Sequence, residues 1–75
     1  MGRPLPFRNR IRALREARGL TQAALATGIG MTRQSVIAIE QGRYSPSLEI
    51  AFRIAHQLDA PLEEVFIWTG DGTAD

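Results

Sequence analysis

One pattern constrains the fold of this chain more than any other feature. It consists of two short stretches in which apolar residues recur at helical spacing, separated by a glycine. Gly30 lies where a tight connection between two helices needs a positive φ angle, which glycine adopts without steric cost. Val36 and Ile39 hold the second helix on the core and leave its first turn free to project outward. Two crossed helices over residues 22–41 are therefore predicted, from the positions Leu25, Ala26, Ile29, Gly30, Met31, Val36 and Ile39.

The rest of the chain shows further helical patterns that begin at capping residues. The expected N-caps are Thr21, Thr32 and Ser47. The expected helices cover about 8–18, 22 to about 27, 32–42, 48 to about 58, and a short segment that Pro61 opens. The inward residues of the fourth helix are expected to be Leu48, Ala51, Ile54, Ala55 and Leu58. These patterns predict an all-α fold, which is a compact five-helix bundle without a strand.

Length and composition predict one small domain. Seventy-five residues lie near the lower limit of what a single hydrophobic core can stabilise. We expect a flexible arm over residues 1–7, the folded domain over 8–68 and a flexible acidic tail over 69–75. Cysteine is absent, so disulfides and thiolate metal sites are excluded. No apolar run approaches the roughly 20 residues of a membrane span, so we expect a cytoplasmic protein without membrane contact.

The charges are distributed unevenly along the chain. Residues 1–53 hold all nine arginines against three glutamates, a net charge of +6. Residues 54–75 hold five acidic residues and no lysine or arginine, a net charge of −5. A basic body with an acidic end favours a polyanionic partner at one surface, and ordinary solvated charge is the alternative.

Residues 20–66 read LTQAALATGIGMTRQSVIAIEQGRYSPSLEIAFRIAHQLDAPLEEVF. This segment resembles the phage repressor and Cro-like helix-turn-helix family. This family of bacterial transcriptional regulators is also called the xenobiotic-response-element family, and the resemblance extends from about residue 8 to residue 66. It implies a lambda-repressor-like bundle whose third helix, about residues 32–41, enters the major groove of double-stranded DNA. It also implies that this helix reads the bases.

By this resemblance, Arg33 and Gln34 occupy the turn that reaches base edges. Arginine can donate two hydrogen bonds to guanine, and glutamine can pair with adenine. Ile37, one turn further on the same face, would contact a thymine methyl group, and the alternative is that it packs against the preceding helix.

The resemblance also assigns phosphate contacts and one ion pair. Gln22 matches a family glutamine that binds a phosphate beside a helix N-terminus, and the alternative is an ordinary first-turn polar residue. Arg15 and Glu40 match positions that form an ion pair between the first and third helices. The full set of expected phosphate contacts is Gln22, Thr32, Gln41, Arg43, Arg8 and Arg10.

Residues suited to catalysis are few. His56 is the only histidine, and with Asp59 it matches the pattern of a surface histidine near a helix C-terminus. Glu63 and Glu64 are neighbours that point different ways, so they make no paired carboxylate site. We expect no enzyme, no metal and no cofactor.

The C-terminal segment carries more apolar bulk than the core needs. We expect Leu62, Phe66, Ile67 and Trp68 to form a homodimer interface, with packing in the chain's own core as the alternative. A symmetric dimer would place two recognition helices about 34 Å apart, one DNA turn, on a palindromic site.

These observations together predict a DNA-binding transcriptional regulator at the nucleoid, most simply a repressor that acts as a homodimer. We expect no small-molecule effector domain, so that its concentration, a protein partner or turnover would control it. The alternative is a protein-interaction module, antitoxin-like or a bridging adaptor, that retains the helix-turn-helix fold. The basic and polar outward residues of the third helix favour DNA over a protein partner.

Overall fold

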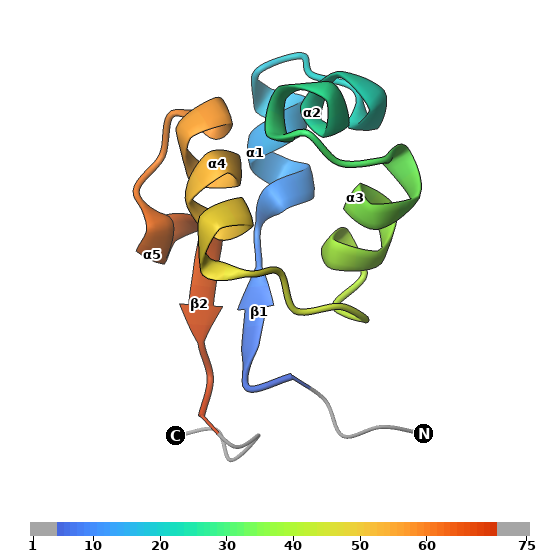
Figure 1. Cartoon of the computed structure of the whole chain (residues 1–75). Helices are drawn as coiled ribbons and strands as arrows, with labels where there is room; N and C mark the ends of the chain where they lie inside the picture. The colour runs from blue at the N-terminus through green and yellow to red at the C-terminus, as the bar shows by residue number, and fades with distance from the viewer. Residues whose placement is uncertain (1–4, 71–75) are drawn as a thin grey trace.

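The computed structural model describes residues 5–70 and contains five helices and a two-stranded antiparallel sheet (Figure 1). The elements are β1 (Phe7–Asn9), α1 (Ile11–Ala17), α2 (Gln22–Ile29), α3 (Arg33–Glu40), α4 (Leu48–Leu58), α5 (Leu62–Val65) and β2 (Phe66–Trp68). The predicted helix bundle is confirmed. Most of the predicted arm and tail lies outside the described residues.

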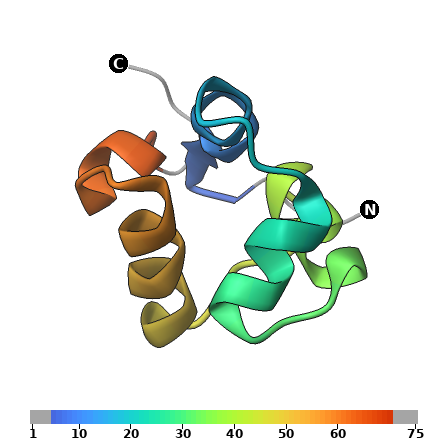
Figure 2. The same cartoon turned by 90° about the horizontal axis from the view of Figure 1, so that it is seen from above.

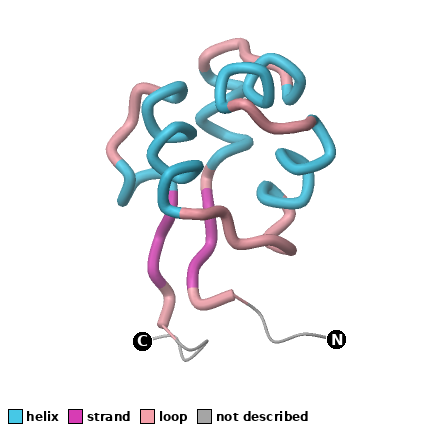
Figure 3. Tube along the Cα trace, viewed as in Figure 1, coloured by secondary structure: helices cyan, strands magenta, loops and turns pink. Residues whose placement is uncertain are grey.

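The expectation of a fold without strands is wrong. Strands β1 and β2 pair antiparallel, with Phe7 opposite Trp68 and Asn9 opposite Phe66, and they lie side by side below the helices (Figure 3). The rings of Phe7 and Phe66 meet edge to face, with centroids 5.9 Å apart. Helix α1 consequently begins at Ile11 and not near Arg8, which lies in β1. Three-residue strands are too short to show an alternating pattern, so the sequence carried no sign of them.

The predicted N-caps of α2, α3 and α4 are confirmed. The hydroxyl oxygens of the N-cap residues accept hydrogen bonds from backbone N–H groups in the first turns of α2, α3 and α4, at 3.0, 3.1 and 3.2 Å. These N-caps are Thr21, Thr32 and Ser47.

The turn between α2 and α3 depends on Gly30, as the sequence predicts. Its φ angle is 75°, and the Met31 N–H beyond it donates to the Ala26 carbonyl at 2.9 Å. Helix α2 runs through Gly28 to Ile29, two residues further than expected. Gly28 therefore lies within the helix, and the left-handed residue that ends it is Gly30.

The core lies between the helices and contains the predicted apolar positions of α2 and α3. The buried residues of the core cluster are Ile11, Leu25, Ala26, Ile29, Val36, Ile39, Ile54, Ala55, Leu58 and Val65. One expectation for α4 is wrong: Leu48 is 67% exposed. It belongs to the first turn of α4, where it lines a surface groove beside Phe66 and Trp68 instead of entering the core.

The helices form two groups around α1. Helix α3 packs mainly against α2, and α4 packs against α1, α2 and α5. Seen from above, the α2–α3 pair lies on one side of the molecule and α4 with α5 lies on the other (Figure 2). None of the helices between residues 5 and 70 is both long enough and apolar enough to cross a membrane.

Candidate nucleic-acid interface

Helix α3 has one buried face and one open face. Val36 and Ile39 are buried in the core, 2% and 1% exposed. Arg33 and Gln34, the first two residues of α3, are exposed. Within residues 5–70, neither of these two side chains takes part in an ion pair or a side-chain hydrogen bond with a neighbour. Their donor and acceptor groups are therefore available to a ligand.

An open groove of about 570 Å³ lies between α1, α2 and α3. We call it the α1–α3 groove. Ile37 is half-buried and faces it, so this side chain is neither a fully exposed apolar residue nor part of the core. The groove brings together residues from three helices: Arg12, Arg15, Glu16, Thr21, Gln22, Ala23, Arg33, Ile37, Glu40 and Gln41.

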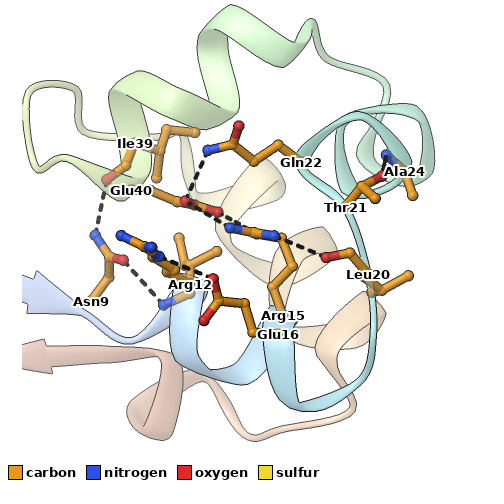
Figure 4. A network of polar contacts seen from close by, with 11 residues as sticks. Asn9, Arg12, Arg15, Glu16, Leu20, Thr21, Gln22, Ala24, Ile39 and Glu40 are labelled. Carbon is orange, nitrogen blue, oxygen red and sulfur yellow. Dashed lines mark hydrogen bonds and ion pairs between the residues drawn. The ribbon is translucent and has the colours of Figure 1, made fainter.

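A buried ion pair joins α1 to the last turn of α3. Arg15 Nε lies 2.7 Å from Glu40 Oε2, and its Nη2 donates to Glu40 Oε1 at 3.3 Å (Figure 4). The two side chains are only 9% and 6% exposed. Arg15 Nη1 also donates to the Leu20 carbonyl at 2.9 Å. The hydrogen bond to Glu40 raises the pKa of Arg15, against the opposing effect of burial, so the guanidinium stays charged.

Gln22 belongs to the same network. Its Nε2 donates to Glu40 Oε1 at 3.2 Å, and Figure 4 shows the amide reaching from α2 toward Glu40. Because an amide nitrogen carries two hydrogens, one N–H remains for another acceptor. Gln22 is half-buried at the side of the α1–α3 groove, so the structure gives it a structural partner that the sequence did not reveal.

The other expected phosphate contacts divide into two groups. Gln41 lines the α1–α3 groove with Arg33, whereas Arg43 is exposed beyond the end of α3 and does not line it. Arg8 and Arg10 are exposed on and beside β1 and also lie outside the groove lining. Thr32 is exposed next to Arg33, where its hydroxyl caps α3.

Sequence reasoning missed three polar side chains near this surface. Arg12 and Glu16 form an exposed pair at 3.1 Å at the side of the groove, with the spacing of neighbours on one helical face. Asn9 donates from Nδ2 to the Ile39 carbonyl at 2.9 Å. An asparagine two residues before an apolar helical pattern is a recognisable turn former, but its partner thirty residues away has no local signal.

A second groove, of about 360 Å³, lies between the sheet and α4. We call it the apolar groove. Of the expected dimer residues, Leu62, Phe66 and Trp68 line it, whereas the half-buried Ile67 does not. Successive residues of β2 point to opposite faces, which separates Ile67 from its neighbours. The lining also includes Phe7, Ser45, Pro46, Ala51 and the unpredicted Leu48.

His56 and Asp59 lie on the surface, away from both grooves. Each is exposed, and the Asp59 carboxylate lies 3.9 Å from the Arg18 guanidinium. The arrangement matches the surface histidine that the sequence indicates.

Comparisons with known proteins include a family match and several transcriptional regulators. The sequence profile of the helix-turn-helix family matches residues 11–65. An uncharacterized HTH-type transcriptional regulator of Methanothermobacter thermautotrophicus is 52% identical over 67 residues, which cover 88% of this chain and 97% of the relative.

A repressor and a controller protein are similar as well. The cryptic phage CTXphi transcriptional repressor RstR of Vibrio cholerae is 37% identical over 59 residues, which cover 79% of this chain and 53% of RstR. The crystal structure of the restriction-modification controller protein C.AhdI from Aeromonas hydrophila superposes with a TM-score of 0.68. It is 37% identical, and the match covers 72% of this chain and 82% of C.AhdI.

Proposed function

The chain belongs to the helix-turn-helix family of DNA-binding transcriptional regulators, and we propose that it is a repressor that binds a short palindromic operator as a homodimer. The observation that carries this proposal is the two-faced α3. Val36 and Ile39 fix one face to the core, and the open face presents Arg33 and Gln34. The family points to a regulator and away from an enzyme. Its place of action is then the nucleoid in the cytoplasm.

We assign base reading to the open face of α3. Arg33 donates two hydrogen bonds to a guanine, and Gln34 pairs with an adenine. Each such contact discriminates against a wrong base by about 1–3 kcal/mol. Ile37 contacts a thymine methyl group from the wall of the α1–α3 groove, which its half-buried position permits.

Phosphate binding is assigned to polar groups around α3. Gln22 and Gln41 line the groove next to the base readers, and Arg43 follows the end of α3. One N–H of the Gln22 side-chain amide donates to Glu40. The other N–H donates to a DNA phosphate. Thr32, Arg8 and Arg10 contact phosphates at the margins of the interface.

The apolar groove is the surface that we propose for the homodimer. Trp68 is 71% exposed and Leu48 67% exposed, and both line the same depression. Exposed side chains of this size are unfavourable in water and are frequent anchors of interfaces. Burying them in a symmetric contact would place two α3 helices on one face of the DNA, about one turn or 34 Å apart.

Repression is supported by the similarity to RstR, whose name describes a transcriptional repressor. A repressor needs only to occupy its operator and exclude polymerase. Activation would need a further surface for polymerase.

Selection of bound sequences from random double-stranded DNA tests the proposal most directly. We expect a short inverted repeat, bound in a salt-dependent way. If no sequence is enriched, the regulator proposal is lost, and capture of a partner protein by α3 becomes the better account of the fold.

The dimer has its own test. We expect the wild-type chain to sediment as a dimer, and Trp68→Ala to weaken self-association by about 2 kcal/mol, as removal of an interface anchor does. Phe52→Ala is the matched control, because Phe52 is 55% exposed on α4 but does not line the apolar groove. A Trp68→Ala chain that dimerises as strongly as wild type would exclude this interface.

A further inference from the structure

Asn9 connects three parts of the molecule through one side chain. Its Oδ1 accepts a hydrogen bond from the Ile11 N–H at 3.1 Å, at the start of α1. Its Nδ2 donates to the Ile39 carbonyl at 2.9 Å, in the last turn of α3. Its own backbone lies in β1, opposite Phe66 of β2. Figure 4 shows the amide between the N-terminus of α1 and Ile39.

The hydrogen bond from Asn9 completes the end of α3. The Ile39 carbonyl also accepts from the Gly42 N–H at 3.0 Å, so both of its lone pairs are used. The next residue, Glu40, is held by Arg15 and Gln22. Two successive residues of α3 are thus tied to β1, α1 and α2 by directed polar contacts, whereas the apolar packing of α3 is mainly against α2.

Asn9 is itself held in a fixed position. The neighbouring Arg10 N–H donates to the Val65 carbonyl at 2.9 Å, and Val65 is fully buried. A hydrogen bond from such a fixed point restrains the direction of the α3 axis more than a contact from a free loop would.

We propose that Asn9 is a positioning residue that sets the orientation of α3 relative to the β1–β2 sheet and so controls sequence-specific DNA binding without contacting DNA. This inference rests on the proposed function of Arg33 and Gln34 as base readers. Arg33 lies six residues, about 9 Å, from Ile39 along the helix, so a tilt of about 6° at the Ile39 end moves Arg33 by about 1 Å. Paired hydrogen bonds to a base edge do not tolerate a displacement of that size.

Asn9→Ser is the variant that separates the two hydrogen bonds of the Asn9 side chain. A serine hydroxyl can still accept from the N–H two residues later, so the start of α1 is kept. The shorter side chain cannot reach the Ile39 carbonyl. Ser47→Ala is the matched control, because it likewise removes one side-chain hydrogen bond, the one that caps α4, where no proposed base or phosphate contact lies.

Binding of the selected operator and of random-sequence DNA is measured for the wild type and both variants, at equal concentrations of folded protein. We expect Asn9→Ser to weaken operator binding about tenfold, with random-sequence binding and the salt dependence unchanged, because phosphate contacts tolerate a tilt that base contacts do not. Ser47→Ala should keep the wild-type ratio of operator to random-sequence affinity. Equal loss of that ratio in both variants, or no loss in Asn9→Ser, overturns the inference.

Amide hydrogen exchange gives a second measurement that needs no DNA. We expect faster exchange in Asn9→Ser at Gly42 and in the last turn of α3, with α2 and α4 unchanged. Unchanged exchange at these amides overturns the inference even if no operator is found. A wild-type chain that selects no DNA sequence contradicts the proposed function, whereas a wild-type chain that selects one while Asn9→Ser keeps full specificity contradicts only the role of Asn9.

Discussion

At its first turn α3 presents Arg33 and Gln34 to solvent, whereas at its last turn Ile39 and Glu40 are held by side chains from β1, α1 and α2. The first turn has unused hydrogen-bonding groups within the described part of the chain. The last turn has a buried ion pair and a carbonyl with both lone pairs engaged. The contrast shows how a helix of eight residues can be anchored at one end and open at the other, which is what the proposed base reading requires.

The anchored end should give the largest effect on stability. Glu40→Ala leaves the Arg15 guanidinium buried without its partner, which typically costs about 3–5 kcal/mol in the free energy of unfolding. The raised pKa of Arg15 keeps its guanidinium charged over the whole range in which the folded protein is studied, so the arginine side of the pair does not titrate there. Urea denaturation measures the change.

Glu16→Ala is the matched control for this prediction. Glu16 also accepts from an arginine, Arg12, but both side chains are largely exposed. We expect a change of less than about 1 kcal/mol. If the two glutamate variants unfold at the same urea concentration, the last turn of α3 is not the anchor described above.

A substitution at the open first turn of α3 should change DNA binding and leave the free energy of unfolding nearly unchanged. Arg33→Ala is expected to remove the preference for one base pair, worth about 1–3 kcal/mol, and to leave the free energy of unfolding within about 0.5 kcal/mol of wild type. Competition binding with operators changed at single positions measures the preference. Arg53→Ala removes the same charge from the exposed side of α4 and should keep all base preferences. Retained discrimination in Arg33→Ala would remove this side chain from the base-reading set.

Substitution of Arg43 should give the smallest effect on DNA binding, and this effect should not depend on the base sequence. It lies beyond the end of α3 and outside the α1–α3 groove, so we expect Arg43→Ala to weaken binding to all sequences alike. The slope of log affinity against log salt should fall in magnitude by about one. A change in base preference in this variant would show that reading extends past the end of the helix.

The helix-turn-helix pair was predictable because its signals are local. The hydroxyl caps at Thr21 and Thr32 depend on N–H groups three residues away, and the left-handed Gly30 depends on its own backbone. The apolar spacing of Val36 and Ile39 then determines which face of α3 is buried. Interactions of this kind can be inferred from a short window of sequence.

The sheet and the polar network were not predictable in the same way. Strands β1 and β2 pair residues about sixty positions apart, and three residues per strand show no periodicity. The amide of Gln22 and the amide of Asn9 find partners 18 and 30 residues away. Leu48 fits the apolar pattern of α4 and yet lines a groove, because the pattern identifies a helix face and not where the core ends.

The sequence by itself determined the helices, their caps, the turn at Gly30 and the chemistry of the open face of α3. Only the tertiary structure decided how α3 is anchored and which apolar residues remain on the surface. The physical reason is range: capping and periodicity act over a few residues, whereas the contacts of Asn9, Gln22 and Glu40 exist only once distant segments are packed together.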